Sequence, residues 1–239
     1  NERVFTLRNI PDTYKIRGYV EEQHPKSAVV VGGGYIGVEM AENLKNAGVD
    51  VTIVELADHV IAPLDYDMAC DVHRYLKEKG VGLILQNGVQ SIREEGGALR
   101  LTLSDGEIDT DLVIMAVGVR PDTALAKEAG LELNRRGAIV VDEHMLTSDP
   151  DIYAVGDAVE VTDFVTGEKA YIPLAGPANK QGRIAADNIC GIPTTYKNTQ
   201  GSAVLKIFDM TVATTGVNER AAKAAGLDYD KVYTFSNSH

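Results

Sequence analysis

Three glycines with fixed spacing are the part of the sequence best suited to chemistry. Gly32, Gly34 and Gly37 fit the pattern G-x-G-x-x-G directly after the apolar run 28–31. Apolar residues at helical spacing follow them, so the glycines lie in a predicted strand-to-helix turn. Gly32 allows the tight turn, Gly34 lets a pyrophosphate approach the backbone, and Gly37 lets helix and strand pack closely. The spacing therefore predicts a turn whose N–H groups bind the phosphates of a dinucleotide.

An acidic residue at the end of the next predicted strand supports this interpretation. Glu55 follows the strand-like run 51–54. A carboxylate there can accept hydrogen bonds from both ribose hydroxyls of an adenosine and repels a 2′-phosphate, which favours NAD(H) over NADP(H). The alternative is that the glycines only form a tight turn and Glu55 is a solvated strand end. The chain holds one such fingerprint, whereas an enzyme using flavin and nicotinamide needs two dinucleotide sites.

Hydrophobic patterning predicts an α/β fold around this turn. The segment 28–54 forms a β-α-β unit whose helix ends at Gly48, and 91–117 alternates as a hairpin region with a turn at 104–107. A second helix carries one apolar stripe, formed by Met68, Ala69, Val72, Tyr75 and Leu76. The other expected elements are strands at 4–7, 81–85, 112–117, 139–141, 152–155, 204–208 and 212–214, helices at 123–130 and 178–189, and a turn at 10–12.

Composition excludes several classes of protein. The 239 residues include 23 Lys plus Arg and 35 Asp plus Glu, a net charge of −12 that argues against nonspecific nucleic-acid binding. Neither a long apolar run nor a basic-then-apolar leader is visible, so we expect no membrane segment and a cytoplasmic location. The chain begins with Asn1 rather than Met, which suggests a piece of a longer protein.

Cysteine and histidine spacing predicts neither a redox pair nor a metal site. Cys70 and Cys190 are too far apart for a C-x-x-C motif, and we expect both to be structural thiols. The histidines show no ligand spacing. They are His24, His59, His73, His144 and His239.

Three later motifs carry a family resemblance. They are Ala116-Val117-Gly118-Val119-Arg120-Pro121, Asp151-Ile152-Tyr153-Ala154-Val155-Gly156-Asp157, and Ile172-Pro173-Leu174-Ala175-Gly176-Pro177-Ala178-Asn179-Lys180-Gln181-Gly182-Arg183. With 32–55, they resemble the FAD-dependent pyridine nucleotide–disulfide oxidoreductases in order and spacing. The last motif resembles the branch of coenzyme A-disulfide reductases, persulfide reductases, NADH oxidases and NADH peroxidases.

The resemblance implies an enzyme that passes hydride from NADH to FAD and on to a cysteine. That cysteine would reduce a small-molecule disulfide, a persulfide or an oxygen species, and the complete protein would be a homodimer. The family's N-terminal FAD fingerprint and its redox cysteine are absent from this chain, so we expect no catalytic residue here. The chain alone is expected to bind NAD(H) and to turn over little or nothing.

The resemblance also implies individual roles. Tyr35 would cover the nicotinamide pocket, with a packing aromatic as the alternative, and Glu39 would lie near the nicotinamide, with a first-turn acid as the alternative. The Asp157 carboxylate would bind the ribityl chain of FAD. The implied NAD-binding residues are Gly32, Gly34, Tyr35, Ile36, Gly37, Glu39, Glu55 and Gly118, and the implied FAD-binding residues are Gly156, Asp157, Pro173, Leu174 and Ala175.

The implied domain order has four parts. Residues 1–24 end a first FAD segment or linker, and 25–142 form the NAD(H)-binding domain. A second FAD segment covers 143–200, and 201–239 begin an α+β dimerisation domain. One alternative is a non-catalytic, NAD(H)-binding redox-sensing module, which would leave the later motifs without a purpose. Another is a simple NAD dehydrogenase, for which the sequence offers no identifiable general base.

Overall fold

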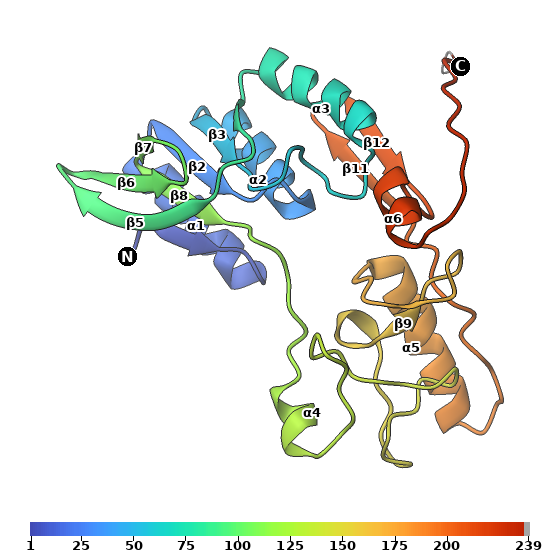
Figure 1. Cartoon of the computed structure of the whole chain (residues 1–239). Helices are drawn as coiled ribbons and strands as arrows, with labels where there is room; N and C mark the ends of the chain where they lie inside the picture. The colour runs from blue at the N-terminus through green and yellow to red at the C-terminus, as the bar shows by residue number, and fades with distance from the viewer. Residues whose placement is uncertain (237–239) are drawn as a thin grey trace. The chain divides into compact units, whose positions relative to one another are not determined.

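The computed structural model describes residues 1–236, which form two compact units (Figure 1). Unit 1 comprises Asn1–Val119 and Val204–Ala213. Unit 2 comprises Arg120–Ala203 and the described residues from Thr214 onward. His239, one of the histidines considered above, lies outside the described residues.

A five-stranded parallel sheet forms the centre of unit 1. Its strand order is β1-β8-β2-β3-β4. Starting at β2, the chain adds β3 and β4 on one side and later β8 on the other. The direction of strand addition therefore reverses between β2 and β8. Such a reversal leaves a crevice at the carboxyl ends of these two strands. The strands are β1 (Val4–Thr6), β2 (Ser27–Val31), β3 (Asp50–Val54), β4 (Gly82–Ile84) and β8 (Leu112–Met115).

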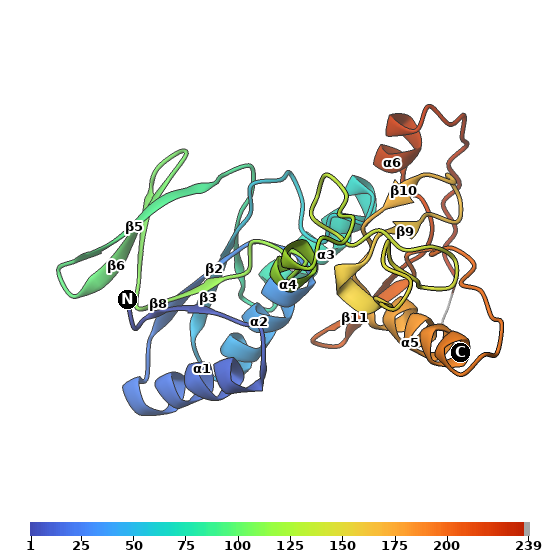
Figure 2. The ribbon, with the colours of Figure 1, turned by 90° about the horizontal axis from the view of Figure 1, so that it is seen from below.

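Helices cover one face of this sheet and a second sheet covers the other. Figure 2 shows α1 and α2 on one side and β5 and β6 on the opposite side. Successive strand residues point to opposite faces, so Val30 belongs to the core beneath the helices while Val29 and Val31 pack against β6. The covering elements are α1 (Ile10–Gln23), α2 (Tyr35–Asn46) and α3 (Tyr66–Glu78) on the helical face, and antiparallel β5 (Val89–Glu95), β6 (Ala98–Leu103) and β7 (Glu107–Thr110) on the other.

The structure confirms the α/β class, the β-α-β unit and the hairpin region, and it corrects two local predictions. Residues 10–12 were expected to form a turn but begin α1. The Asn9 side chain accepts a hydrogen bond from the Asp12 N–H at 3.0 Å, and Pro11 lies in the first turn, where its missing N–H costs nothing. In α3, Met68 is 51% exposed, so the buried stripe does not include it.

Residues 1–24 and the segment Val204–Ala213 belong to unit 1, which differs from the predicted domain boundaries. β1 pairs with β8, so residues 1–24 contribute a strand and a helix to the layers that the prediction began at residue 25. The hairpin of β11 (Ala203–Ile207) and β12 (Met210–Thr214) buries Ile207 in the core beneath the helices. Lys79 on α3 forms an ion pair with Asp209 at 2.9 Å. The assignment of cofactors to these segments stays a prediction.

Unit 2 has short elements. Two expected strands, 139–141 and 152–155, form only isolated bridges, in which Ile139 pairs with Leu133 and Val159, and Tyr153 pairs with Leu146. Only one residue of each segment forms β-bridges, so neither segment becomes a strand. Helix α5 starts at Ala175, three residues before the expected start at residue 178. The elements are α4 (Ala124–Glu128), the 3₁₀ turn η1 (Gly156–Ala158), β9 (Val161–Thr162), β10 (Lys169–Ala170), α5 (Ala175–Ile189) and α6 (Glu219–Ala224).

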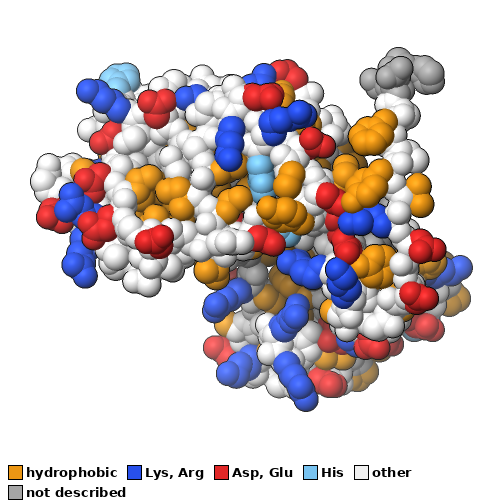
Figure 3. All heavy atoms as spheres, turned by 45° about the horizontal axis from the view of Figure 1, so that its top comes forward, with side chains coloured by type: hydrophobic (Ala, Val, Ile, Leu, Met, Phe, Trp, Pro, Cys, Tyr) orange, Lys and Arg blue, Asp and Glu red, His pale blue; other side chains and the backbone are white. Residues whose placement is uncertain are grey.

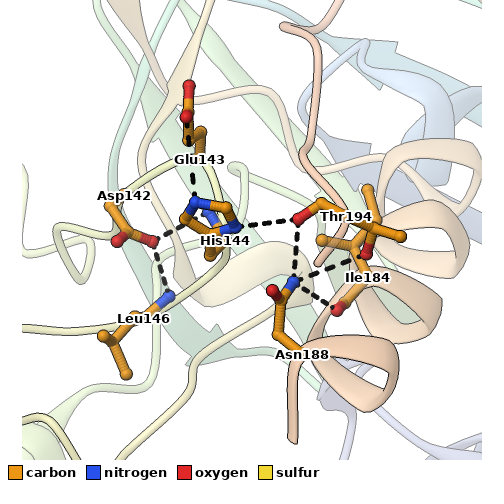
Figure 4. Close-up of polar contacts among 7 residues, drawn as sticks. All are labelled: Asp142, Glu143, His144, Leu146, Ile184, Asn188 and Thr194. Atoms are coloured by element: carbon orange, nitrogen blue, oxygen red, sulfur yellow. Dashed lines mark hydrogen bonds and ion pairs between the residues drawn. The ribbon is translucent and has the colours of Figure 1, made fainter. Parts of the chain in front are cut away.

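A polar cluster attaches the segment around His144 to the end of α5 (Figure 4). The carbonyl oxygen of Thr194 accepts hydrogen bonds from His144 Nδ1 and from the Asn188 side chain, both at 2.9 Å. Asp142 accepts from the backbone N–H groups of His144 and Leu146. These contacts hold an irregular segment in place where few strand hydrogen bonds are available.

Candidate functional site

A pocket of about 470 Å³ lies in the predicted crevice of unit 1. Gly32, Gly34, Glu55 and Gly118 line it, together with the loop after β3. Figure 3 shows hydrophobic side chains exposed among charges of both signs on one face of the molecule. Among the residues lining the pocket, Leu56 is 73% exposed. The pocket therefore offers both apolar surface and a carboxylate.

The glycines of the turn are of two kinds: some have no space for a Cβ, and one borders open space. A Cβ on Gly32 would collide with the carbonyl oxygen of Ala116, and Gly32 also has φ = +106°. A Cβ on Gly37 would collide with the carbonyl oxygen of Gly32. A Cβ on Gly34 would meet nothing within 4 Å. The fold thus requires Gly32 and Gly37, whereas Gly34 leaves open space beside the start of α2.

The N-terminus of α2 borders this open space. Gly34 is its N-cap residue, and no side chain caps the helix there. The first N–H groups of a helix have no partner inside the helix, and together they carry partial positive charge. A phosphate group fits both the open space and the charge.

Glu55 joins the glycine turn to the loop after β3. Its Oε2 accepts a hydrogen bond from the Gly33 N–H at 2.5 Å, and its Oε1 accepts from the Ala57 N–H at 2.8 Å. A carboxylate has about four acceptor positions, so two remain for other donors. The residue is only partly buried and lines the pocket. It can accept hydrogen bonds from ribose hydroxyls while the backbone holds it in place.

The other predicted NAD-binding residues do not line this pocket. Tyr35 packs partly buried against the core beneath the helices. Ile36 and Glu39 line a different pocket of about 480 Å³ between α1 and α2. The structure therefore gathers Gly32, Gly34, Glu55 and Gly118, and places the α2 residues on other faces of the helix.

Sequence patterns did not reveal two buried histidines near the pocket. His73 on α3 accepts a hydrogen bond from the Val60 N–H through Nε2 at 3.2 Å. His59 lines the pocket and bonds Asp58 through Nδ1. Its Nε2 is the one buried side-chain nitrogen or oxygen without a partner among residues 1–236. For His73, helical spacing could have indicated burial, because His73 lies on the same face of α3 as the buried Ala69.

In unit 2, the predicted FAD-binding residues lie around the start of α5. The Gly156 N–H donates a hydrogen bond to Gln181 Oε1 at 2.8 Å, and Gly156 has φ = +85°. Asp157 is exposed, and burial followed by the charge of Asp157 raises the pKa of Tyr171. Leu174 is the N-cap residue of α5, with no side-chain cap. The exposed carboxylate can accept hydrogen bonds from a polyol. The open helix N-terminus beside it suits a partly anionic ring.

The cysteines offer no disulfide within the described chain. Cys70 lies on α3 and Cys190 follows α5, and both are free and exposed. No group of three or more potential metal ligands occurs within residues 1–236. Within the same residues, no helix combines the length and apolar character that crossing a membrane requires.

Comparisons with known proteins identify the family of this chain and several relatives. The model of the pyridine nucleotide-disulphide oxidoreductase family matches residues 1–182. An NADH oxidase of Methanocaldococcus jannaschii is 44% identical over 223 residues, which are 92% of this chain and 49% of that protein. The chain spans about half the length of the curated relatives it matches.

Two solved structures are also similar. Reduced CoADR-RHD of Bacillus anthracis gives a TM-score of 0.91 with 51% identity, and the match covers 95% of this chain and 41% of that one. An NAD-dependent persulfide reductase from A. fulgidus gives a TM-score of 0.91 with 43% identity, covering 95% of this chain and 42% of that one.

Proposed function

This chain belongs to the pyridine nucleotide-disulphide oxidoreductase family, and from this premise we propose that it is the NAD(H)-binding part of a flavin-dependent oxidoreductase. The complete enzyme would pass hydride from NADH to FAD and on to a cysteine outside this chain. Its substrate would be a disulfide, a persulfide or an oxygen species. A homodimer completed by the domain that starts near residue 201 is part of the same proposal.

The observation that carries the proposal is the pocket beside the glycine turn. Its open side at Gly34 suits a pyrophosphate, and the N-terminus of α2 supplies hydrogen-bond donors and positive charge. Glu55 suits the adenosine ribose, because two acceptor positions remain after its backbone contacts. The exposed Leu56 suits the apolar face of an adenine.

Further residues would place the nicotinamide half. Gly118 has φ = +101°, and a Cβ at this position would meet nothing within 4 Å. It therefore leaves room for the cofactor along the pocket edge. Tyr35, Ile36 and Glu39 follow the turn on α2. Although Tyr35 and Glu39 do not line the pocket, the family resemblance leads us to assign them to the nicotinamide end, with Gly37 holding the helix against the strand.

Unit 2 would bind part of FAD. Asp157 would accept hydrogen bonds from the ribityl hydroxyls, and Gly156 would allow the backbone to approach. Pro173, Leu174 and Ala175 would present the start of α5 to the flavin ring. When bound, the two cofactors supply the hydride chemistry, while these residues bind and orient.

The competing proposal is a non-catalytic, NAD(H)-binding redox sensor. It shares the pocket of unit 1 but assigns no role to the arrangement of Gly156, Asp157 and the start of α5. The two proposals differ in whether the complete protein contains FAD.

Titration of the purified chain with NADH tests the proposal. Binding is followed by the change in NADH fluorescence, with NADPH as the comparison ligand. We expect saturable NADH binding that is stronger than NADPH binding. Absence of NADH binding by the folded chain would contradict the proposed site.

A further inference from the structure

A buried histidine behind the pocket contacts the loop that forms one of its walls. We propose, on the basis of the NAD(H) site above, that His73 is a positioning residue. Its neutral imidazole holds residues 58–61 against the glycine turn by accepting the hydrogen bond from the Val60 N–H. Dinucleotide affinity then depends on the protonation of a side chain that does not touch the ligand.

Three contacts connect His73 to the phosphate-binding turn. His73 Nε2 accepts from the Val60 N–H at 3.2 Å. A Cβ on Gly33 would lie 2.7 Å from Val60 Cγ1, so the Val60 side chain packs directly beneath the turn. The next residue, Ile61, donates its N–H to the Gly33 carbonyl oxygen at 2.8 Å. A change at His73 is therefore transmitted to Gly33, immediately before the open space at Gly34.

The donor in this contact fixes the protonation state of the ring. A backbone N–H can only donate, so His73 Nε2 carries no proton. In a protonated ring Nε2 carries a proton, so the Nε2–H group would face the Val60 N–H and the hydrogen bond would break. The loop would then lose its attachment to α3 at Val60, and Ile61, which has φ = +56°, would lose part of the packing that holds this conformation.

The surroundings of His73 favour the neutral ring. Burial is the main cause that lowers the pKa of His73, and the neighbouring His59 and Lys77 lower it further. Asp58 acts in the opposite direction. His59 stands beside Tyr66, with ring centroids 6.1 Å apart, and bonds Asp58. The hydrogen bond to Val60 is therefore intact at neutral pH and is lost as the pH falls through the pKa of His73.

Binding of ADP-ribose, which is stable in acid, tests the coupling. For the wild-type chain we expect the Kd to be constant near pH 7.5 and to rise on acidification towards pH 5.5, by up to about tenfold per pH unit once His73 is protonated. The variant His73→Gln retains an acceptor that does not titrate. It should bind as the wild type does near pH 7.5 and show a flat profile. The variant His73→Leu should bind roughly tenfold more weakly than the wild type near pH 7.5 and should show a flat profile, because the Val60 N–H has no partner at either pH.

The exposed His24 provides the control. It caps α1 in a left-handed conformation that Asn tolerates, so His24→Asn should keep the wild-type affinity and pH profile. If His73→Gln retains the wild-type pH dependence, or His73→Leu binds as tightly as the wild type near pH 7.5, the proposal is wrong. If the wild-type chain does not bind ADP-ribose near pH 7.5, the NAD(H) site itself fails and this inference fails with it.

A measurement on the wild-type chain avoids variants that fold poorly. Protonation and binding are linked, so ADP-ribose must lower the pKa of His73 if it binds the neutral form more tightly. Histidine ring NMR signals, titrated with and without ADP-ribose, report this directly. We expect Nε2 of His73 to be unprotonated at neutral pH and its pKa to fall on binding. An unchanged pKa would overturn the coupling even though binding occurs.

Discussion

The side chain of Gln181 accepts a hydrogen bond from the backbone N–H of Gly156 at 2.8 Å, across 25 residues of sequence. Gln181 is 1% exposed, so this contact is shielded from water. It joins the two segments of unit 2 that the family resemblance assigns to FAD. The conformation of the Gly156 turn, and with it the position of Asp157, depends on α5.

Replacement of Gln181 by Leu should destabilise unit 2. The partly buried Gly156 N–H would lose its acceptor, which costs about 1 kcal/mol. Hydrogen exchange measures this locally, with faster exchange expected in residues 154–160 and unchanged exchange in β2 and β3. Lys180→Ala changes an exposed neighbour on the same helix and should leave both regions unchanged. Unchanged exchange in Gln181→Leu would show that the contact contributes nothing.

Alanine at Gly34 and at Gly37 should give opposite defects. Gly34→Ala adds a methyl group in open space, so the melting temperature should stay near the wild-type value while NADH affinity falls at least about tenfold, because the methyl group meets the pyrophosphate. Gly37→Ala drives a Cβ into the Gly32 carbonyl and should lower the melting temperature. Gly18→Ala, in an open position on α1, should raise stability by about 0.5–1 kcal/mol without affecting NADH binding.

The carboxylate of Glu55 should set the preference for NADH over NADPH. Glu55→Gln keeps the shape but loses the negative charge and replaces one acceptor oxygen by a donor, so one of the two backbone N–H groups that bond Glu55 also loses its acceptor. We expect NADH affinity to fall roughly fivefold and NADPH affinity to stay equal or rise, since the repulsion of a 2′-phosphate is removed. Paired fluorescence titrations measure the ratio. An unchanged ratio would place the origin of the preference elsewhere in the loop after β3.

Asp111 should make unit 1 sensitive to acid. Burial pushes the pKa of Asp111 upward, but hydrogen bonds from the N–H groups of Lys26 and Ser27 and from the Ser27 hydroxyl outweigh it, so the pKa lies below the usual value. A depressed carboxylate pKa contributes stability that is complete above about pH 4 and is lost below it.

Asp111→Asn should therefore lower the unfolding free energy by about 1 kcal/mol near neutral pH. The difference from the wild type should narrow below about pH 4. Urea unfolding across this range measures the effect. The exposed Asp71 on α3 serves as the control, and Asp71→Asn should change the unfolding free energy little. A difference that stayed constant in acid would show that the charge of Asp111 is not responsible.

Strong periodicity made most of unit 1 predictable, and weak local signals caused the errors. The buried runs of β2 and β8 and the apolar stripe of α3 needed only local patterns. Helix α1 was missed because Asn9, Pro11 and Asp12 suit both a turn and a helix start. The expected strands in unit 2 failed because a strand needs a partner of matching length, which local sequence does not reveal.

The candidate site was predictable where backbone geometry restricts residue type. Gly32 and Gly37 have no space for a side chain, so their spacing carried real information. His73 and Gln181 gave no such signal, because their roles depend on partners 13 and 25 residues away. The comparisons confirm the predicted family, while the activity and cofactors of the complete protein and the individual binding residues stay proposals.

The visible absorbance spectrum of the purified chain, before and after anaerobic addition of NADH, tests whether this chain is the NAD(H)-binding part of a divided site. We expect the chain to bind NADH but to show no flavin band, because it holds one dinucleotide fingerprint and the proposed flavin site needs residues outside it. A flavin band that bleaches on addition of NADH would contradict this expectation, since the chain would then build a complete flavin site by itself.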